Sequence, residues 1–218
     1  MIDKPRQSGQ IMTNILIIGN ARDEKLSKWN SLIENSDIII ACDGAINRCI
    51  EQQINVNYLI GDMDSITQEI LEQVKFSNVE IIEIQEQNNN DLTKAIIFSQ
   101  RFEPKDVNII GVDGGNSDHQ FCNYMSLIEC NSNAKIHLDD CTVCVVHQSE
   151  MEYFSIEIGT LFSLFSIGTS LGVNLTGAKW ELENSTLTPS SNGLHNIATS
   201  ERIGLSCESG NLLLFVNR

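Results

Sequence analysis

Five aspartates in this sequence fall where a short apolar run has just ended, and carboxylates gathered in this way can hold a metal ion. They are Asp43, Asp62, Asp64, Asp91 and Asp118. In open α/β sheets, ligands bind outside the carboxyl ends of the strands, so all these side chains are expected along one edge. Like charges a few ångströms apart raise one another's pKa unless a cation is present, and Mg²⁺ prefers oxygen ligands. The pattern therefore favours a magnesium site.

The spacing of Asp62 and Asp64 is the most specific part of this set. They lie two residues apart in Gly61-Asp62-Met63-Asp64-Ser65, and both can reach one ion, or two adjacent ions, if this stretch turns at the tip of a strand. Aspartate also caps helices and occupies turns. That alternative stays open for any single aspartate, but it accounts poorly for all of them together.

A glycine-rich segment over residues 111–119 has features of a phosphate-binding turn. It runs from the end of a predicted strand through Gly114, Gly115 and Asn116 into a predicted helix. Glycine lets the backbone approach a phosphate closely, and a helix N-terminus adds N–H donors and a positive dipole. The segment lacks the lysine and following hydroxyl residue of a Walker loop, and its glycines do not have the Rossmann spacing. A plain tight turn remains an alternative.

The residues from Asn14 to Asp140 have the pattern of a layered α/β domain. Unbroken apolar runs, typical of strands buried on both faces of a parallel sheet, are separated by amphipathic stretches. The runs are residues 15–18, 38–41, 58–60, 79–84 and 107–111. We expect a mainly parallel sheet with helices on its faces within residues 14–140, carrying the acid cluster and the glycine-rich turn. Residues 1–13 are expected to form a flexible N-terminal extension.

The pattern changes near residue 141. Residues 154–158 alternate between apolar and polar side chains, turn signals become frequent, and no convincing helical pattern remains. Gly159-Thr160 and residues 208–211 each separate two apolar runs, as hairpin loops do. Residues 141–218 are therefore expected to form a small antiparallel, sandwich-like β domain packed against the first domain.

Composition restricts the class of partner and the compartment. The formal net charge of −15 argues against nucleic acid, because phosphate backbones attract basic surfaces; ATP stays possible if a metal and local cations screen it. No segment approaches the roughly 18 consecutive apolar residues of a membrane helix, and no apolar signal core follows Met1. Seven cysteines without a secretion signal favour free thiols in a reducing cytoplasm.

Taken together, the motifs resemble the thiamine pyrophosphokinase family over nearly the whole chain from Asn14 onward. The family's Gly-Asp-Phe-Asp-Ser signature is similar to residues 61–65, and its Asp-Gly pair after the second strand is similar to Asp43-Gly44. Its Gly-Leu-Lys-Trp motif is similar to residues 177–180.

Two further motifs of the family resemble this sequence with one replacement each. The Gln-x-x-Thr-Asp stretch is similar to residues 87–91, with Asn90 in place of threonine. The Gly-Gly-Arg-x-Asp-His stretch is similar to residues 114–119, with Asn116 in place of arginine. The loss of that cation could shift contact with ATP phosphates to Lys94, Lys179 or Arg48.

The resemblance implies an α/β nucleotide domain followed by a β-sandwich domain, working as a homodimer. It also implies transfer of the diphosphate of ATP to the hydroxyl of thiamine, with Mg²⁺ as cofactor and ATP as co-substrate. The active sites would lie between subunits, with ATP and Mg²⁺ on the aspartates of one chain and thiamine against the β domain of the other.

By the same resemblance, individual residues receive expected roles. The metal ligands would be Asp62, Asp64 and Asp91. The catalytic residues would be Asp64, Asp91 and Asp118, with Asp91 or Asp118 accepting the hydroxyl proton. The residues contacting ATP or thiamine would be Asp43, Gln87, Asn90, Lys94, Gly114, Gly115, Asn116, Trp180 and Asn196. Trp180 would stack on the thiamine ring, and Asn196 fits the family's late asparagine better by distance than Asn192.

Two other functions stay open. A related pyrophosphokinase acting on a pterin alcohol would use similar aspartates, although Trp180 in its Gly-x-Lys-Trp setting favours thiamine. A non-catalytic module that binds a nucleotide or thiamine is suggested by the loss of the arginine at Asn116. The acid cluster argues against such a module, since a binder needs no group of this kind.

Overall fold

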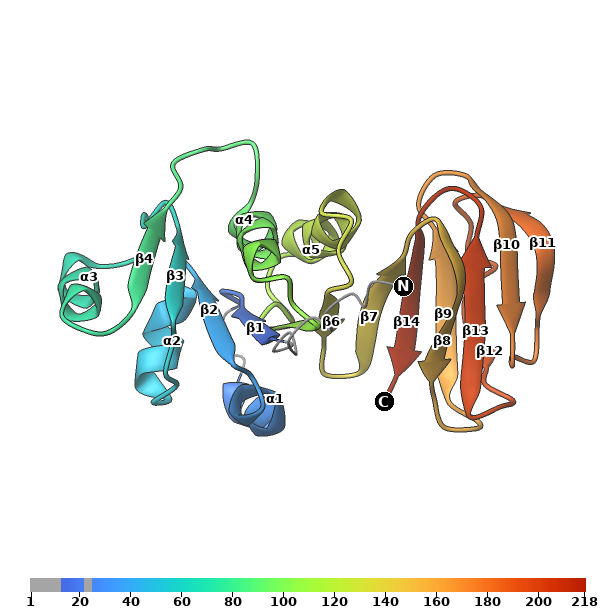
Figure 1. Cartoon of the computed structure of the whole chain (residues 1–218), viewed down its shortest axis with the longest axis horizontal. Helices are drawn as coiled ribbons and strands as arrows, with labels where there is room; N and C mark the ends of the chain where they lie inside the picture. Colours follow the sequence, from blue (N-terminus) through green and yellow to red (C-terminus); the bar gives the residue numbers. More distant parts are fainter. Residues whose placement is uncertain (1–12, 22–24) are drawn as a thin grey trace, which may run out of the picture.

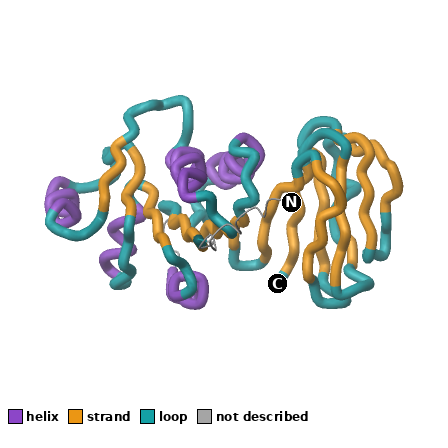
Figure 2. The backbone as a smooth tube through the Cα atoms, viewed as in Figure 1, coloured by secondary structure: helices purple, strands orange, loops and turns teal. Residues whose placement is uncertain are grey.

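The computed structural model describes residues 13–21 and 25–218. Residues 1–12, nearly all of the predicted N-terminal extension, lie outside the described residues. The described chain is mixed α/β, with a large sheet that is mainly parallel in its first half and a separate antiparallel sheet, which confirms the predicted fold class. Figure 2 shows the described helices gathered in one half of the molecule and only strands and loops in the other.

A parallel sheet forms the centre of the α/β half. Its strands are β1 (Asn14–Ile18), β2 (Ile38–Cys42), β3 (Tyr58–Gly61), β4 (Glu80–Glu83), β5 (Asp106–Ile110) and β6 (Lys135–His137). Their order in the sheet is β4-β3-β2-β1-β5-β6, and the first five strands along the chain each overlap one of the predicted apolar runs. Along the chain, β2, β3 and β4 are added on one side of β1, and β5 and β6 are then added on its other side. This switch point opens at the carboxyl ends of β1 and β5.

Helices cover both faces of this sheet (Figure 1). They are η1 (Leu26–Trp29), α1 (Asn30–Glu34), α2 (Ala45–Glu51), α3 (Gln68–Lys75), α4 (Asp91–Ser99), η2 (Gln100–Phe102) and α5 (Ser117–Glu129). Ile17 and Ile40 pack with residues of α4 and α5 on one face, whereas Leu16 and Ile39 pack with residues of η1, α2 and α3 on the other. Neighbouring residues of one strand thus enter different cores, which is why the apolar runs are unbroken.

The β half continues the large sheet and adds a second one. Its strands are β7 (Cys141–Val146), β8 (Ser149–Ser155), β9 (Leu161–Ser166), β10 (Ser170–Thr176), β11 (Leu182–Leu187), β12 (Asn196–Ile197), β13 (Arg202–Cys207) and β14 (Leu212–Asn217). β7 pairs antiparallel with β6, and β14, β9 and β12 follow outward, so the large sheet crosses residue 140 without a break. The second sheet has the order β11-β10-β13-β8. Val146, Phe162 and Leu214 from the large sheet share a core with Val173 and Leu205 from the second.

The prediction of two hairpins was wrong. β8 pairs with β13 in the second sheet, whereas β9 pairs with β14 and β12 in the large sheet, so the turn at Gly159-Thr160 connects the two sheets. Residues 208–211 likewise lead from β13 in one sheet to β14 in the other. Turn chemistry fixes a reversal of the chain, but the pairing partner depends on which core each strand face enters.

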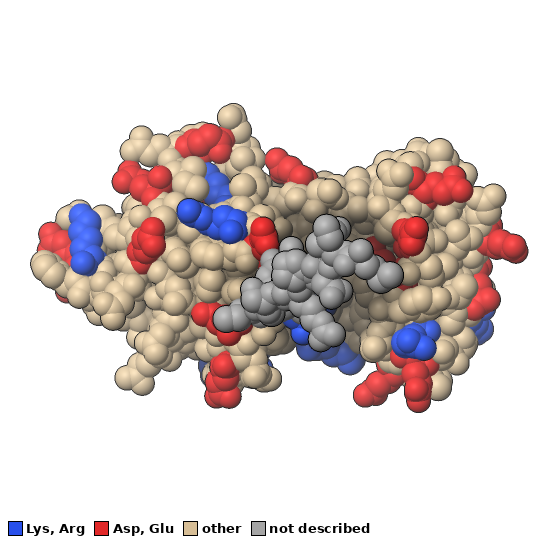
Figure 3. Space-filling view, in the orientation of Figure 1, with Lys and Arg blue, Asp and Glu red and all other residues tan. Residues whose placement is uncertain are grey.

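Acidic side chains are spread over the face of both halves seen in Figure 3, in keeping with the net charge of −15. Among the described residues, none of the helices has the length and apolar character needed to cross a bilayer.

Candidate active site at the carboxyl edge of the sheet

The ends of the neighbouring strands β2 and β3 approach each other closely. Asp43 follows β2 with a φ of 37°, and Met63 follows β3 with a φ of 67°, so the backbone turns sharply just after each strand. A Cβ placed on Gly61, the last residue of β3, would lie 2.8 Å from the Cβ of Asp43. Glycine at this position therefore permits the close approach of the two strand ends.

Asp43, Asp62 and Asp64 form a three-carboxylate group at this edge. One oxygen from each lies within 4.8 Å of the others. The backbone N–H of Ser65 donates to Oδ2 of Asp43 at 3.2 Å, and the Ser65 hydroxyl donates to Oδ1 of Asp64 at 3.0 Å. Asp43 is only 3% exposed, and its Oδ1 is buried without a hydrogen-bond partner among the described residues. A buried anionic oxygen beside two further carboxylates is suited to a divalent cation.

Gln87 contacts this group from the loop between β4 and α4. Its Nε2 donates to Oδ2 of Asp62 at 3.1 Å. The other carboxylate oxygen of Asp62, Oδ1, accepts the backbone N–H of Asp64 at 3.3 Å. Both bonds stabilise the anion and hold the pKa of Asp62 below its ordinary value. Asp62 is therefore ionised at neutral pH and can serve as a metal ligand.

Asp91 reaches the same edge from the first turn of α4, in a different environment. Burial raises the pKa of Asp91, the Lys94 ammonium opposes this, and the charges of Asp43 and Asp62 raise it further. Nζ of Lys94 lies 3.3 Å from Oδ1 of Asp91 and 3.2 Å from the carbonyl oxygen of Ile84. The Lys94 side chain is buried, at 5% exposure. Asp91 thus lies outside the three-carboxylate group but within its electrostatic reach.

The amide of Asn90, expected to line the substrate pocket, makes hydrogen bonds inside the protein. Its Oδ1 accepts the backbone N–H of Thr93 at 2.7 Å and caps α4. Its Nδ2 donates to the hydroxyl of Ser126 on α5 at 3.1 Å. The amide therefore joins α4 to α5 at the end of α4 that carries Asp91.

The glycine-rich turn between β5 and α5 is open to solvent. Gly114 and Gly115 have φ values of 78° and 79°, and a Cβ on either would meet no atom of residues 13–21 or 25–218 within 4 Å. Asn116 is the N-cap residue of α5 but makes no side-chain capping bond, and Asp118 accepts the backbone N–H of His119 at 3.0 Å. The turn leaves room for a ligand in front of its backbone, whereas Asp118 is not part of the three-carboxylate group.

Trp180 and Asn196 lie together, away from the acids. The backbone N–H of Trp180 donates to Oδ1 of Asn196 at 3.2 Å, and Nδ2 of Asn196 donates to the carbonyl oxygen of Trp180 at 2.8 Å. The Trp180 side chain is 54% exposed, with Nζ of Lys179 at 4.5 Å from its ring centroid. The turn between β10 and β11 that carries it lies at the other end of the long axis from β2 and β3 (Figure 1). Within one chain, the structure does not bring Trp180 to the acids.

The switch point between β1 and β5 holds contacts that the sequence analysis left unassigned. The Gly19 N–H donates to the carbonyl oxygen of Ile110 at 2.8 Å, and the Ala21 N–H donates to that of Gly111 at 2.7 Å. A guanidinium nitrogen of Arg48 lies 2.5 Å from the Gly19 carbonyl oxygen. The sequence signal for this loop pair was a glycine directly after each of the two strands.

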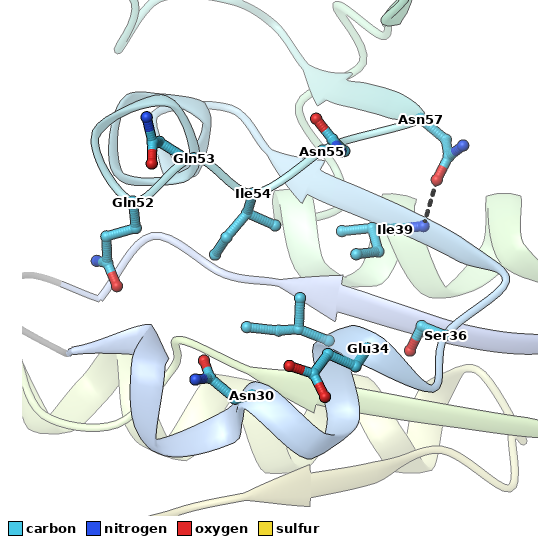
Figure 4. A pocket seen from close by; sticks show the side chains of 10 residues that line it. Asn30, Glu34, Ser36, Ile39, Gln52, Gln53, Ile54, Asn55 and Asn57 are labelled. Carbon is cyan, nitrogen blue, oxygen red and sulfur yellow. Dashed lines mark hydrogen bonds between the residues drawn. The ribbon is translucent and has the colours of Figure 1, made fainter.

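A polar hollow of about 440 Å³ lies at the opposite, amino-terminal edge of the sheet (Figure 4). Amide side chains such as Gln53 and Asn55 line it together with the apolar side chains of Ile39 and Ile54. The Oδ1 of Asn57 accepts the backbone N–H of Ile39 at 2.7 Å. This hollow contains none of the site residues expected from the sequence.

Comparison with known proteins adds a family and a set of similar folds. The family model described as "Thiamin pyrophosphokinase, catalytic domain" matches residues 29–138, half of the chain. No curated protein matches the sequence.

Several solved structures share the fold over almost the whole chain. A thiamine pyrophosphokinase from Bacillus subtilis is 19% identical with a TM-score of 0.77, covering 94% of this chain and 98% of its own. A thiamin pyrophosphokinase from Candida albicans is 15% identical with a TM-score of 0.79, covering 100% of this chain and 95% of its own. A thiamin pyrophosphokinase from Geobacillus thermodenitrificans is 17% identical with a TM-score of 0.78, covering 94% and 97%. At these identities the likeness shows a common fold.

Proposed function

This chain belongs to the thiamin pyrophosphokinase family, and on that premise we propose that it transfers the diphosphate of ATP to the hydroxyl of thiamine. The products would be thiamine diphosphate and AMP. The observation that carries the proposal is the three-carboxylate group of Asp43, Asp62 and Asp64 at the carboxyl edge of the parallel sheet. Ligands of such sheets bind at this edge.

The donor set fits a magnesium ion. Asp62 and Asp64 would hold it, with Asp91 as the next carboxylate. Asp43 would contribute its buried Oδ1, which has no hydrogen-bond partner within the described part of the chain. The bound ion would offset the charge of the ATP phosphates, which is the main requirement of phosphoryl-type transfer. The hydroxyl and backbone N–H of Ser65 keep two of these carboxylates oriented.

The reaction requires a nucleophile, a leaving group and a proton acceptor. The thiamine hydroxyl oxygen would form a bond to the β-phosphorus of ATP, while the bond from that phosphorus to the oxygen shared with the α-phosphate breaks and AMP leaves. Asp91 is suited to accept the hydroxyl proton, because burial raises its pKa and makes it the stronger base. Lys94 restrains the Asp91 carboxylate. Asp118, the other candidate from the sequence, lies exposed at the start of α5.

Thiamine would bind at Trp180 of a second copy of the chain. Half of the Trp180 side chain is exposed, and Asn196 holds its backbone on both sides. An exposed aromatic face suits a cationic ring such as that of thiamine. The turn between β10 and β11 that carries Trp180 lies far along the long axis from the ends of β2 and β3 that carry the acids (Figure 1), so a homodimer would be needed to bring them together. All seven cysteines are free thiols, which suits the cytoplasm as the compartment of this reaction.

A direct test measures AMP release with ATP, Mg²⁺ and either thiamine or a pterin alcohol. We expect AMP release with thiamine, and we expect Asp64→Asn to lower kcat by about 100- to 1000-fold, a loss typical of removing a transition-state contact. The matched control is Glu80→Gln, which removes the same charge from an exposed residue at the amino-terminal edge of the sheet. Its activity should equal that of the unmodified protein.

Each outcome separates the candidates. Release of AMP with the pterin alcohol alone would favour the alternative substrate. Binding of thiamine and ATP without turnover would identify a non-catalytic module. Full activity of Asp64→Asn would contradict the assignment of the acids.

A further inference from the structure

A buried serine on α5 lies at the junction between α5 and the first turn of α4. Ser126 is 1% exposed. Its oxygen is 3.1 Å from Nδ2 of Asn90 and 2.9 Å from the hydroxyl of Thr93, which is itself 1% exposed. The Ser126 hydroxyl also donates a hydrogen bond to the carbonyl oxygen of Cys122 at 3.0 Å. Ser126 therefore receives two donors from α4 and donates within α5.

The turn of α4 held in this way is the one that carries Asp91. On the side facing the sheet, the thiol of Cys42 lies 3.7 Å from the carbonyl oxygen of Asp91, and Cys42 directly precedes Asp43. On the side facing α5, the contacts of Asn90 and Thr93 with Ser126 fix the same turn. The placement of Asp91 beside the three-carboxylate group thus depends on contacts to β2 on one side and to α5 on the other.

We propose that Ser126 is a positioning residue that sets the place of Asp91 at the active site without touching substrate, nucleotide or metal. This inference rests on the proposed function, because the role of Asp91 does. It also assigns Asn90 a second role: its amide transmits the position of α5 to α4, in addition to capping α4.

Removal of the Ser126 hydroxyl would leave the buried Thr93 hydroxyl, and the amide of Asn90 at the more exposed start of α4, without this acceptor. Buried donors are rarely left unpaired, because each then loses its hydrogen bonds to water without replacement. The first turn of α4 would shift to find other partners, or water would enter between α4 and α5. Reacting groups tolerate little displacement, since a misplacement of about 1 Å can cost roughly 100-fold in rate.

The test compares Ser126→Ala with the unmodified protein in two measurements. The first is steady-state turnover of ATP and thiamine, where we expect kcat to fall by roughly 10-fold, as for residues that orient metal ligands. KM for thiamine should be unchanged, because Trp180 and Asn196 lie in the β half. The second is Mn²⁺ titration with electron paramagnetic resonance, where the Kd should rise by a similar factor.

Ser99→Ala is the matched control. Ser99 is a buried serine at the other end of α4, and its hydroxyl donates to the carbonyl oxygen of Ile96 at 2.7 Å. Its loss should lower stability without changing kcat or the Mn²⁺ Kd. Ser126→Thr keeps the hydroxyl and should hold kcat within about threefold of the unmodified value, a smaller loss than in Ser126→Ala. Thr93→Val removes one of the two donors and should give a smaller loss in the same direction, should Ser126→Ala fold poorly.

The outcomes are separable from those of the proposed function. An unmodified protein without turnover would refute the proposed function, and the Mn²⁺ titration would still report whether Ser126 acts on the carboxylates. Unchanged kcat and Kd in Ser126→Ala would overturn the inference. Equal losses in Ser126→Ala and Ser99→Ala would do so too, because they would reflect stability alone.

Discussion

Asp43 is a buried acid in a place where the fold supplies few donors. Its Oδ2 accepts the backbone N–H of Ser65, while its Oδ1 has no partner among the described residues, and Asp62 and Asp64 lie beside it. Such an arrangement costs free energy in the metal-free protein, because like charges repel and one buried oxygen loses its hydrogen bonds to water. A bound cation would remove both costs, so the group should be stabilised by Mg²⁺.

Replacement of Asp43 by asparagine should separate metal binding from folding. Without metal, we expect Asp43→Asn to melt at the same or a higher temperature than the unmodified protein, because one repelling charge is gone and Oδ1 of asparagine can still accept from Ser65. At Mg²⁺ concentrations 100 times Kd, binding should stabilise the unmodified protein by about 2.7 kcal/mol. Asp43→Asn should lose most of this gain, as measured by thermal unfolding with EDTA or Mg²⁺.

Asp37→Asn is the control for this substitution. Asp37 lies before β2, at the opposite edge of the sheet, where it accepts the backbone N–H of Asn14 at 2.8 Å. The Asp37→Asn variant should be stabilised by Mg²⁺ as much as the unmodified protein. An undiminished response in Asp43→Asn would exclude Asp43 from the metal site.

The sequence allowed several of these side chains to be placed together, but not their individual environments. The position of Asp62 and Asp64 after a buried strand was enough to expect them beside Asp43, because carboxyl ends of parallel strands share an edge. The hydrogen bond between Asn90 and Ser126 joins residues 36 positions apart and depends on how α4 packs on α5. No local pattern reports such a distance.

The end of β6 links three distant parts of the chain. Nε2 of His137 lies 2.8 Å from Oδ1 of Asn108. Nδ1 of the same ring lies 3.2 Å from a guanidinium nitrogen of Arg218. The same guanidinium lies 4.6 Å from the ring centroid of Trp29 in η1. Burial, together with the charges of Arg218 and Lys135, lowers the pKa of His137 to about 4.

This lowered pKa predicts a loss of stability in acid. The unfolded chain binds a proton at His137 near pH 6.5, whereas the folded chain resists it until about pH 4. The contribution is therefore fully present above pH 6.5 and is lost as the pH falls towards 4. The free energy of unfolding of the unmodified protein should fall between pH 7 and pH 4. In His137→Gln this fall should be smaller by about 2 kcal/mol, a value that allows for the partial exposure of the ring.

Urea unfolding at a series of pH values would measure this difference. His119→Gln, at an exposed position on α5, is the control and should leave the pH profile unchanged. A profile of His137→Gln that parallels that of the unmodified protein would contradict the role of His137.

The elements of the α/β half could be predicted more fully than those of the β half. The strands β1, β2 and β3 are mostly buried, so each left an unbroken apolar run in the sequence, whereas the edge strand β4 is partly exposed. In the β half, the turns at Gly159-Thr160 and residues 208–211 were recognised as turns, but β8 and β13 enter one sheet while β9 and β14 enter the other. A local turn signal carries no information about which sheet the next strand joins.

The large sheet crosses from the α/β half into the β half through β6 and β7, where strand direction reverses. The ends of β2 and β3, which carry the acids, and the turn between β10 and β11, which carries Trp180, lie in opposite halves of the long axis of one chain (Figure 1). The sequence resemblance had implied a site shared between subunits, and the separation within one chain supports that proposal without testing it.

A mixture of two inactive variants would test the shared site. Asp64→Asn removes an acid and Trp180→Ala removes the proposed thiamine contact, so each alone should be inactive. When the two variants pair at random, about half of the dimers contain one copy of each. Each of these mixed two-fold dimers has one intact site out of two, so activity should recover to about a quarter of the unmodified value. The mixture is unfolded and refolded together before the assay. Activity that stays at the level of the separate variants would contradict a site built from two chains.

The most direct measurement of the central claim follows the phosphorus atoms of ATP. The protein is incubated with Mg²⁺, thiamine and ATP labelled at the β-phosphate, and the products are separated. Diphosphate transfer predicts that the label moves into thiamine diphosphate while unlabelled AMP forms in equal amount. Label found in ADP, with thiamine unchanged or carrying a single phosphate, would contradict the proposed reaction.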